Sequence, residues 1–275
     1  MPTPLMAVDG HHLLYRAWFG FSERRVMSSD GQDLTGVFGF IALLRKAHLE
    51  AAPDHEIVVA FDAENAAAAR QARDSRYKES RAGADHTAIR SLGMVRQCLD
   101  AAGIRWAEVA GAEGDDLLAT LTDAASADNR PVTCYSGDKD LYQLLSDEVS
   151  ILTPARRRVI AGDLPSSHGV TADQWPDYRA LTGDPSDGIP GIRGIGPRTA
   201  ASLLEGGIHL EHLRDSPRLS RPRCREIAGR WDELVTWRDL IRLNTHVPLP
   251  DGLLSGWTTP PLPRAAEILD QVSLW

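Results

Sequence analysis

The sequence predicts an α/β protein: a mostly parallel sheet flanked by helices, followed by a helical C-terminal region. Strand-like and helix-like stretches alternate up to about residue 170, which is typical of a parallel sheet. Beyond that point we expect only helices and turns, with a proline-rich tail over residues 247–263. With 275 residues, 43% of them hydrophobic, the chain can bury a core of this kind. We therefore expect two parts, residues 1–170 and 171–275, with a boundary between 165 and 175.

Local patterns place the elements along the first part of the chain. Apolar, β-branched runs predict strands at 4–9, 55–62, 103–109, 131–135 and 149–153. Helical patterns lie between or after them at 11–21, 37–52, 85–102, 112–126 and 139–145. Residues 64–84 are polar and cationic and have no apolar stripe. This segment is expected to be exposed, with alanines that favour a helix.

Composition excludes several classes of protein. The three cysteines, Cys98, Cys134 and Cys224, are widely spaced and form no CxxC pattern, which argues against a disulfide framework or a zinc site and fits a reducing cytoplasm. No apolar run approaches the roughly 20 residues of a membrane span, and the N-terminus has no signal-peptide pattern. The net charge of −8 would by itself argue against a nucleic-acid partner. A basic surface for nucleic acid would therefore have to be confined to one part of the molecule. Lysine is rare, with only three in the chain, so the position of Lys78 within a motif-like stretch is informative.

Carboxylates follow four successive strands of the predicted sheet: Asp9, Asp62, Glu113, Asp115, Asp116, Asp138 and Asp140. The carboxyl ends of parallel strands meet at one edge, where such folds place their sites. Any single acid, such as Asp138, could instead cap a helix. Glu113, however, continues the apolar stripe of Leu117 and Leu121 and is expected to point inward.

These carboxylates cannot all stay ionised side by side without counterions, because like charges raise each other's pKa. Oxygen ligands without His or Cys favour hard cations, so the sequence predicts Mg²⁺ or Mn²⁺. Their number indicates two or more ions, roughly 4 Å apart, the arrangement that hydrolyses phosphodiesters.

A second signal is the stretch "GDPSDGIPGIRGIGPRTAASLL", which begins with Asp184 and Asp187 and predicts a helix-hairpin-helix over about residues 184–206. Its glycines let backbone N–H groups converge, and Pro197 begins a helix whose N-terminus faces an anion. A plain connector is the alternative. Beside the acids, we expect a grip on the nucleic-acid backbone that is independent of base sequence. The expected DNA contacts are Gly191, Gly194, Ile195, Gly196, Arg198 and Thr199.

The motifs together resemble the 5′ nucleases, a family that includes flap endonucleases and the N-terminal nuclease domain of bacterial DNA polymerase I. The matching stretches are "VDGHHLLYRA", "VVAFDA", "RQARDSRYKESRAG", "AEGDDLLATL", "SGDKDLYQLLS" and "DYRALTGDPSDGIPGIRGIGPRTAASLL". Their order and spacing match over about residues 5–245. The resemblance implies a PIN-like 5′ nuclease core followed by the helix-hairpin-helix (H3TH) region.

The resemblance also implies an activity: metal-dependent 5′-3′ exonuclease and flap endonuclease cleavage of DNA in replication and repair, such as removal of Okazaki-fragment flaps. One implied metal group is Asp9, Asp62, Glu113 and Asp115. The other is Asp116, Asp138, Asp140 and Asp187, with Asp184 beside it. A K⁺ ion bound by hairpin carbonyls near Gly191 to Ile195 is implied as well.

In such nucleases a helical arch surrounds the single-stranded 5′ end, and here it would span about residues 64–92. Its basic and aromatic positions correspond to Arg70, Tyr77, Lys78 and Arg81. A cation there could stabilise transition-state charge, and Tyr77 could stack on a base. The alanines before Arg70, and Ala112 in place of a common tyrosine, depart from the family. These departures put in question how the 5′ strand threads through the arch and how its bases stack on aromatic side chains.

The resemblance further implies a monomer in the bacterial cytoplasm, associated with the nucleoid, that acts on 5′ flaps, nicks and 5′ ends together with a DNA polymerase and a ligase. No polymerase segment follows, so a stand-alone enzyme is expected. A non-catalytic protein that binds DNA junctions is the main alternative, and the complete carboxylate set argues against it. A nucleotide-dependent oxidoreductase is disfavoured because "VDGHHLL" has only one glycine.

Overall fold

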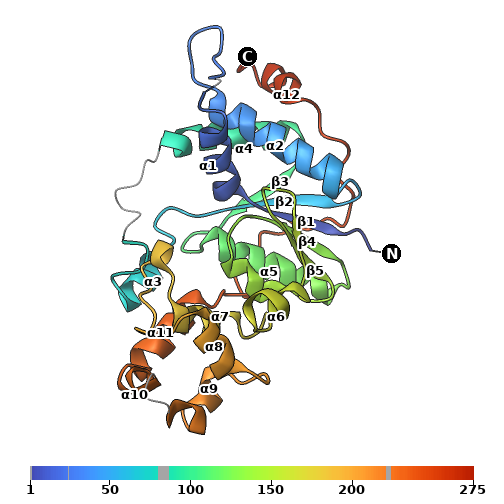
Figure 1. Cartoon of the computed structure of the whole chain (residues 1–275). Coiled ribbons are helices and arrows are strands. Elements are labelled where there is room, and N and C mark those ends of the chain that lie inside the picture. Colours follow the sequence, from blue (N-terminus) through green and yellow to red (C-terminus); the bar gives the residue numbers. More distant parts are fainter. Residues whose placement is uncertain (1, 24, 80–86, 221–223) are drawn as a thin grey trace.

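The computed structural model describes residues 2–23, 25–79, 87–220 and 224–275. Within them, six strands form one sheet in the order β3-β2-β1-β4-β5-β6 (Figure 1). The strands are β1 (Leu5–Asp9), β2 (Glu56–Phe61), β3 (Arg105–Glu108), β4 (Val132–Tyr135), β5 (Val149–Leu152) and β6 (Arg158–Val159). The first five are parallel, as the sequence predicts. The two-residue β6 adds an antiparallel edge.

The central strands β1 and β2 are almost completely buried, as expected of parallel strands covered on both faces. Asp9 pairs with Ala60, so β1 and β2 end at the same edge. Gly10 makes this pairing possible, because a Cβ there would lie 2.3 Å from the Phe61 ring. The carboxyl ends of the two strands, and the acids at or just after them, are thereby brought together.

Helices cover both faces of the sheet (Figure 1). One face packs against α1 (Gly10–Gly20), α2 (Thr35–Ala51), α4 (Leu92–Ala101) and α12 (Ala265–Gln271). The other face packs against α5 (Gly114–Ala127). The apolar cluster on the α5 side continues without interruption into the C-terminal helices.

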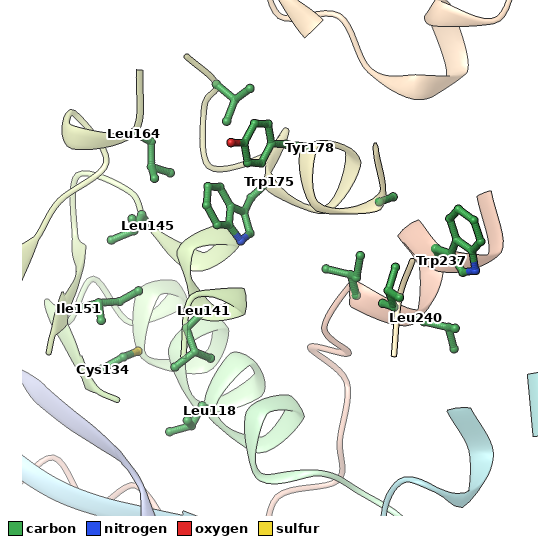
Figure 2. Packing of buried hydrophobic residues seen from close by; sticks show 14 of the residues in the cluster. Leu118, Cys134, Leu141, Leu145, Ile151, Leu164, Trp175, Tyr178, Trp237 and Leu240 are labelled. Atoms are coloured by element: carbon green, nitrogen blue, oxygen red, sulfur yellow. The ribbon is translucent and has the colours of Figure 1, made fainter. Parts of the chain in front are cut away.

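The C-terminal region shares its core with α5. Its helices are α6 (Asp163–His168), α7 (Trp175–Thr182), α8 (Pro197–Leu204), α9 (Leu210–Leu213), α10 (Arg225–Gly229) and α11 (Trp231–Ile241), with 3₁₀ turns η4 (Pro185–Asp187) and η5 (Pro217–Ser220). Trp175 and Trp237 are fully buried and belong to the same cluster as Leu118 of α5 (Figure 2). This shared packing ties the hairpin before α8 to the cluster that includes α5, through Ile189, Ile192 and Ile195.

Three expected helices differ in the structure. The segment over 85–102 is described from residue 87 as a 3₁₀ turn, η2 (Thr87–Ser91), followed by α4. The segment after β4 is also 3₁₀, η3 (Asp140–Leu144), because the Asp138 side chain accepts the Asp140 N–H and tightens the turn. Over residues 64–79 of the arch, only α3 (Ala68–Arg73) is α-helical. Asp74 ends it by pairing with Arg76 and accepting a hydrogen bond from Trp237.

The tail after α11 crosses back over the sheet and is tied to β2. Glu56 accepts hydrogen bonds from the backbone N–H of Ser255 (2.6 Å) and of Gly256 (3.0 Å), and from Arg130 (2.6 Å). Burial alone would raise the pKa of Glu56, but the hydrogen bonds from Ser255 and Arg130 outweigh it and lower this pKa below its usual value. No helix in the described ranges is both long and apolar enough to cross a membrane.

Glu56 should therefore make the stability of the protein depend on pH. A lowered carboxyl pKa contributes stability above the unfolded-state pKa, and this contribution is lost as the pH falls through the folded-state pKa. We expect Glu56→Gln to lower the unfolding free energy by roughly 1–3 kcal/mol at pH 7. Denaturant unfolding at pH 7 and pH 3 should show this difference shrinking in acid. The exposed Glu148→Gln serves as the control, and an equal difference at both pH values would contradict the assignment.

Candidate active site

Asp9 ends β1 and Asp62 directly follows the neighbouring strand β2, and both are held by neighbouring polar groups. Asp9 accepts the backbone N–H of His12 (2.9 Å) and the Ser136 hydroxyl (2.7 Å). Asp62 accepts the N–H of Gly114 (2.6 Å) at the N-terminus of α5, where the helix dipole favours a negative charge. Gly114 permits this approach, since a Cβ there would lie 3.1 Å from the same carboxylate oxygen.

Asp115, in the first turn of α5, completes what we call the inner group: Asp9, Asp62 and Asp115. Burial, and then the charges of Asp138 and Asp9, raise the pKa of Asp115 well above its usual value. Burial also raises the pKa of Asp9. Carboxylates that raise each other's pKa in this way are crowded, and a cation among them would relieve the repulsion.

Three further carboxylates form what we call the hairpin group: Asp140, Asp184 and Asp187. All three are buried, and their ligand atoms lie within 4.8 Å of one another. Burial and the charge of Asp138 raise the pKa of Asp140 to about 7. The charge of Asp138 acts on both Asp115 and Asp140, so this carboxylate is close enough to influence the inner group and the hairpin group.

Glu113 is buried just before α5 and receives three donors on one oxygen. Its Oε2 accepts from Lys78 Nζ (2.6 Å) and the Tyr77 hydroxyl (3.1 Å), and it pairs with Arg70 (3.3 Å). Its Oε1 is buried and has no hydrogen-bond partner. A buried carboxylate oxygen without a partner is costly, so this atom fits a ligand position for a cation.

Asp116 differs from the other acids. It forms a bidentate pair with Arg70, with both contacts at 2.8 Å, and also accepts the Asn244 N–H (2.8 Å). Arg70 in turn donates to the carbonyl of Leu240 (3.0 Å) and is only 13% exposed. The sequence places Asp116 among the metal ligands and Arg70 at the DNA. In the structure the two pair with each other and join α3 to α5 and to the end of α11, and their predicted roles stay predictions.

The described arch residues lie against the lead-in of the hairpin. The Lys78 N–H donates to the carbonyl of Asp187 (2.9 Å), with Lys78 in the left-handed region at φ +53°. Tyr77 is only 4% exposed and packs in the core cluster, so this structure leaves no open ring face for the expected stacking. Arg81 lies outside the described residues.

Arg179 was not anticipated from the sequence. From α7 it donates to Asp140 Oδ1 (3.3 Å), to Asp184 Oδ2 and to the carbonyl of Gly183 (3.3 Å). The available signal was a charged residue on a helix that is otherwise largely buried. Its partner Asp140 lies 39 residues away in the sequence, so only the packing of α7 against η3 reveals the pair.

The hairpin itself divides into anchoring and exposed residues. Gly191 is in the left-handed region at φ +67°, and a Cβ there would lie 2.5 Å from the Gly183 nitrogen. Ile195 is buried, so its side chain anchors the turn. Gly194, Gly196 and Arg198 are exposed and Thr199 partly so, at or just before the start of α8.

A second cluster, Asp177, His209 and Glu211, also has the composition of a metal site. Asp177 accepts the Leu210 N–H (3.2 Å) and contacts His209 Nδ1 (3.0 Å). The Arg238 guanidinium lies 3.8 Å from the other Asp177 oxygen and contacts Glu211. Arg238 already provides the positive charge that these carboxylates need. We therefore interpret the cluster as a structural link between α7, α9 and α11 rather than as a metal site.

Acidic groups at the carboxyl edge of a parallel sheet, beside a helix-hairpin-helix, define a class of metal-dependent nucleases, and comparison with known families agrees. Residues 4–167 match the N-terminal resolvase-like domain of 5′-3′ exonucleases, and residues 170–260 match the C-terminal SAM fold of the same family. The chain belongs to the 5′-3′ exonuclease family, which confirms the resemblance.

Relatives of the chain include DNA polymerases I. The chain is 38% identical over 246 residues to the thermostable DNA polymerase I of Thermus aquaticus and 32% identical over 279 residues to that of Mycobacterium tuberculosis. The matches cover 89% and 98% of this chain but only 29% and 30% of the relatives. The chain therefore corresponds to less than a third of each polymerase.

Solved structures share the fold. The T5 5′-exonuclease with bound zinc ions superposes with a TM-score of 0.70 at 20% identity, over 97% of this chain and 98% of that one. Human GEN1 in complex with Holliday junction DNA gives a TM-score of 0.61 at 16% identity, over 100% of this chain and 68% of that one. These comparisons confirm the predicted fold: a mostly parallel sheet with a helical C-terminal region.

Gly188 tests the contact between arch and hairpin. It lies at φ +72°, and a Cβ there would be 2.0 Å from the Arg76 carbonyl oxygen. Gly252 has almost the same conformation, φ +71°, with no atom within 4 Å of its Cβ position. We expect Gly188→Ala to lower the unfolding free energy by about 1–3 kcal/mol more than Gly252→Ala, because the added methyl overpacks the contact. Equal losses in denaturant unfolding would show that the contact is not tight.

Proposed function

We propose that this protein is a structure-specific 5′ nuclease that hydrolyses phosphodiester bonds at 5′ ends and 5′ flaps of DNA in replication and repair, including the flaps of Okazaki fragments. The observation that carries the proposal is the presence of two acidic groups at one edge of the sheet, with the charge of Asp138 acting on both. Such a charge arrangement destabilises a protein unless cations occupy it. The nearby hairpin supplies a surface for the DNA backbone.

The residues fit a divalent metal centre. The unpartnered oxygen of Glu113 and the crowded inner group would hold one ion, and the hairpin group would hold a second, with the charge of Asp138 acting on both groups. Ligand atoms that are all oxygens favour Mg²⁺ or Mn²⁺. When bound, such ions supply an activated water and stabilise the charge on the scissile phosphate and leaving oxygen.

The protein's own cations then act on the phosphate. Lys78 is held on Glu113, with the carboxylates of Asp115 and Asp187 also near its charge. From there its ammonium group can stabilise the negative charge that develops on a phosphate at the acidic edge. Arg70 and Tyr77 contact the same glutamate and hold it in position. The family resemblance adds Arg81 as a further cation for the 5′ strand.

The hairpin before α8 is the proposed duplex grip. Exposed glycines at 194 and 196 let a phosphate approach the backbone, and the N-terminus of α8 favours an anion. Contacts of this kind are independent of base sequence. A K⁺ ion coordinated near Gly191 to Ile195 belongs to the same proposal and rests on the family resemblance alone.

The proposed setting also follows from the family. The chain resembles the nuclease part of DNA polymerases I, so we propose that it works as a monomer on flaps and nicks left by a polymerase and passes the product to a ligase. It would do so in the bacterial cytoplasm, at the nucleoid.

Asp138 tests the metal centre. Asp138→Asn removes the charge that acts on both acidic groups, with little change of shape. The metal centre should then lose several kcal/mol of its stabilisation of the transition state. We expect cleavage of a labelled double-flap DNA in Mg²⁺ to slow on the order of 10²- to 10³-fold. Asp147→Asn, at an exposed site, is the matched control. Mapping the cut with and without Mg²⁺ checks both the metal requirement and the position of cleavage.

The same assay separates the two hypotheses. If Asp138→Asn kept full activity, Asp138 would not be part of the metal centre. If the wild-type protein bound the double flap without cutting it in Mg²⁺ and in Mn²⁺, the protein would be a junction-binding protein, and the nuclease proposal would be wrong.

Arg198 tests the hairpin. Phosphate contacts release counterions, so the affinity for flap DNA should fall as salt rises. We expect Arg198→Ala to weaken binding to different DNA sequences about equally and to reduce the slope of log K against log[salt] by about 1. Fluorescence anisotropy in Ca²⁺ or without metal ions measures this, with the exposed Arg157→Ala as control. An unchanged slope would place the phosphate contacts elsewhere.

A further inference from the structure

Arg179 occupies a position that the proposed chemistry leaves unexplained. It enters the hairpin group from α7, with a side chain only 18% exposed, and contacts two of the three carboxylates. A third contact, to the carbonyl of Gly183 (3.3 Å), fixes the guanidinium from the other side. A cation is therefore held by the protein inside a group of acids that would otherwise hold a metal ion.

We propose that Arg179 is a built-in counter-cation that weakens the binding of a divalent ion by the hairpin group. The inference rests on the proposed metal-dependent function. Arg179 acts through Asp140 and Asp184, so it is a positioning residue.

The hydrogen bonds of Asp184 support this assignment. Its Oδ1 accepts both the N–H (3.0 Å) and the hydroxyl of Ser186, and its Oδ2 accepts from Arg179. Both oxygens are therefore engaged by the protein. Asp140 shares Oδ1 with Arg179. An ion entering the hairpin group would have to compete with Arg179 for two of the three carboxylates.

Electrostatics gives the direction of the effect. A fixed positive charge in contact with the ligands repels an incoming dication and, without metal, offsets the repulsion among the carboxylates. Asp9 and Asp62 of the inner group are held by backbone N–H groups and the Ser136 hydroxyl, while the neighbouring Glu113 is in contact with Lys78 and Arg70. Arg179 has the corresponding effect on the hairpin group and raises the metal concentration at which that group fills.

Arg179→Met tests the proposal, because methionine keeps much of the length of the side chain and removes the charge. We expect one of the Mn²⁺ dissociation constants, measured by calorimetry on the DNA-free protein, to fall at least about tenfold. The metal-free variant should melt at a lower temperature than wild type, and Mn²⁺ should raise its melting temperature by more. Arg157→Met is the matched surface control and should leave both quantities unchanged.

The outcomes are distinguishable. Mn²⁺ dissociation constants that all stay unchanged or rise in Arg179→Met would overturn the inference. So would a variant with weaker DNA binding but an unchanged Mn²⁺ titration, which would make Arg179 a DNA contact. If Arg179→Met does not fold, Arg179→Gln, which keeps a hydrogen-bond donor without the charge, is judged by the same criteria. If wild type binds no Mn²⁺ at all, the proposed function fails, independently of Arg179.

Discussion

The repulsion among buried carboxylates at the carboxyl edge of the sheet is the constraint on which the rest of this structure depends. Backbone amides and hydroxyls offset part of it at Asp9 and Asp62. Cationic side chains offset more, and they come from two segments: the arch provides Lys78 and Arg70, and α7 provides Arg179. What remains uncompensated, including a buried oxygen of Glu113, is the part that metal ions are suited to occupy.

The coupling of arch and hairpin follows from the same constraint. Lys78 has its ammonium group on Glu113 and its N–H on the carbonyl of Asp187, so one residue contacts the acidic edge and the lead-in of the hairpin. Gly188 makes room for the backbone of Arg76. A movement of the arch would therefore shift a cation at the acidic edge and disturb the contact with the hairpin group together.

A single apolar cluster gives this arrangement its rigidity. Helix α5 carries Asp115 in its first turn and packs Leu118 among residues of the C-terminal helices, including Trp175 (Figure 2). The helix thus joins the acidic edge to the core that supports the hairpin. The regions matched to two family domains share this core, so the spacing between acids and hairpin is set by packing rather than by a linker.

The sequence by itself determined the sheet, the helical C-terminal region, and the acids at strand ends. Parallel strands place their carboxyl ends at one edge, so the proximity of Asp9 and Asp62 follows from local pattern. Only the tertiary structure decided which acids meet cations. Asp116 pairs with Arg70 and Asp140 with Arg179 across long sequence separations, and Tyr77 is buried rather than exposed. Such pairings depend on which helix surfaces pack together, and periodicity within one segment contains no information about its neighbours in space.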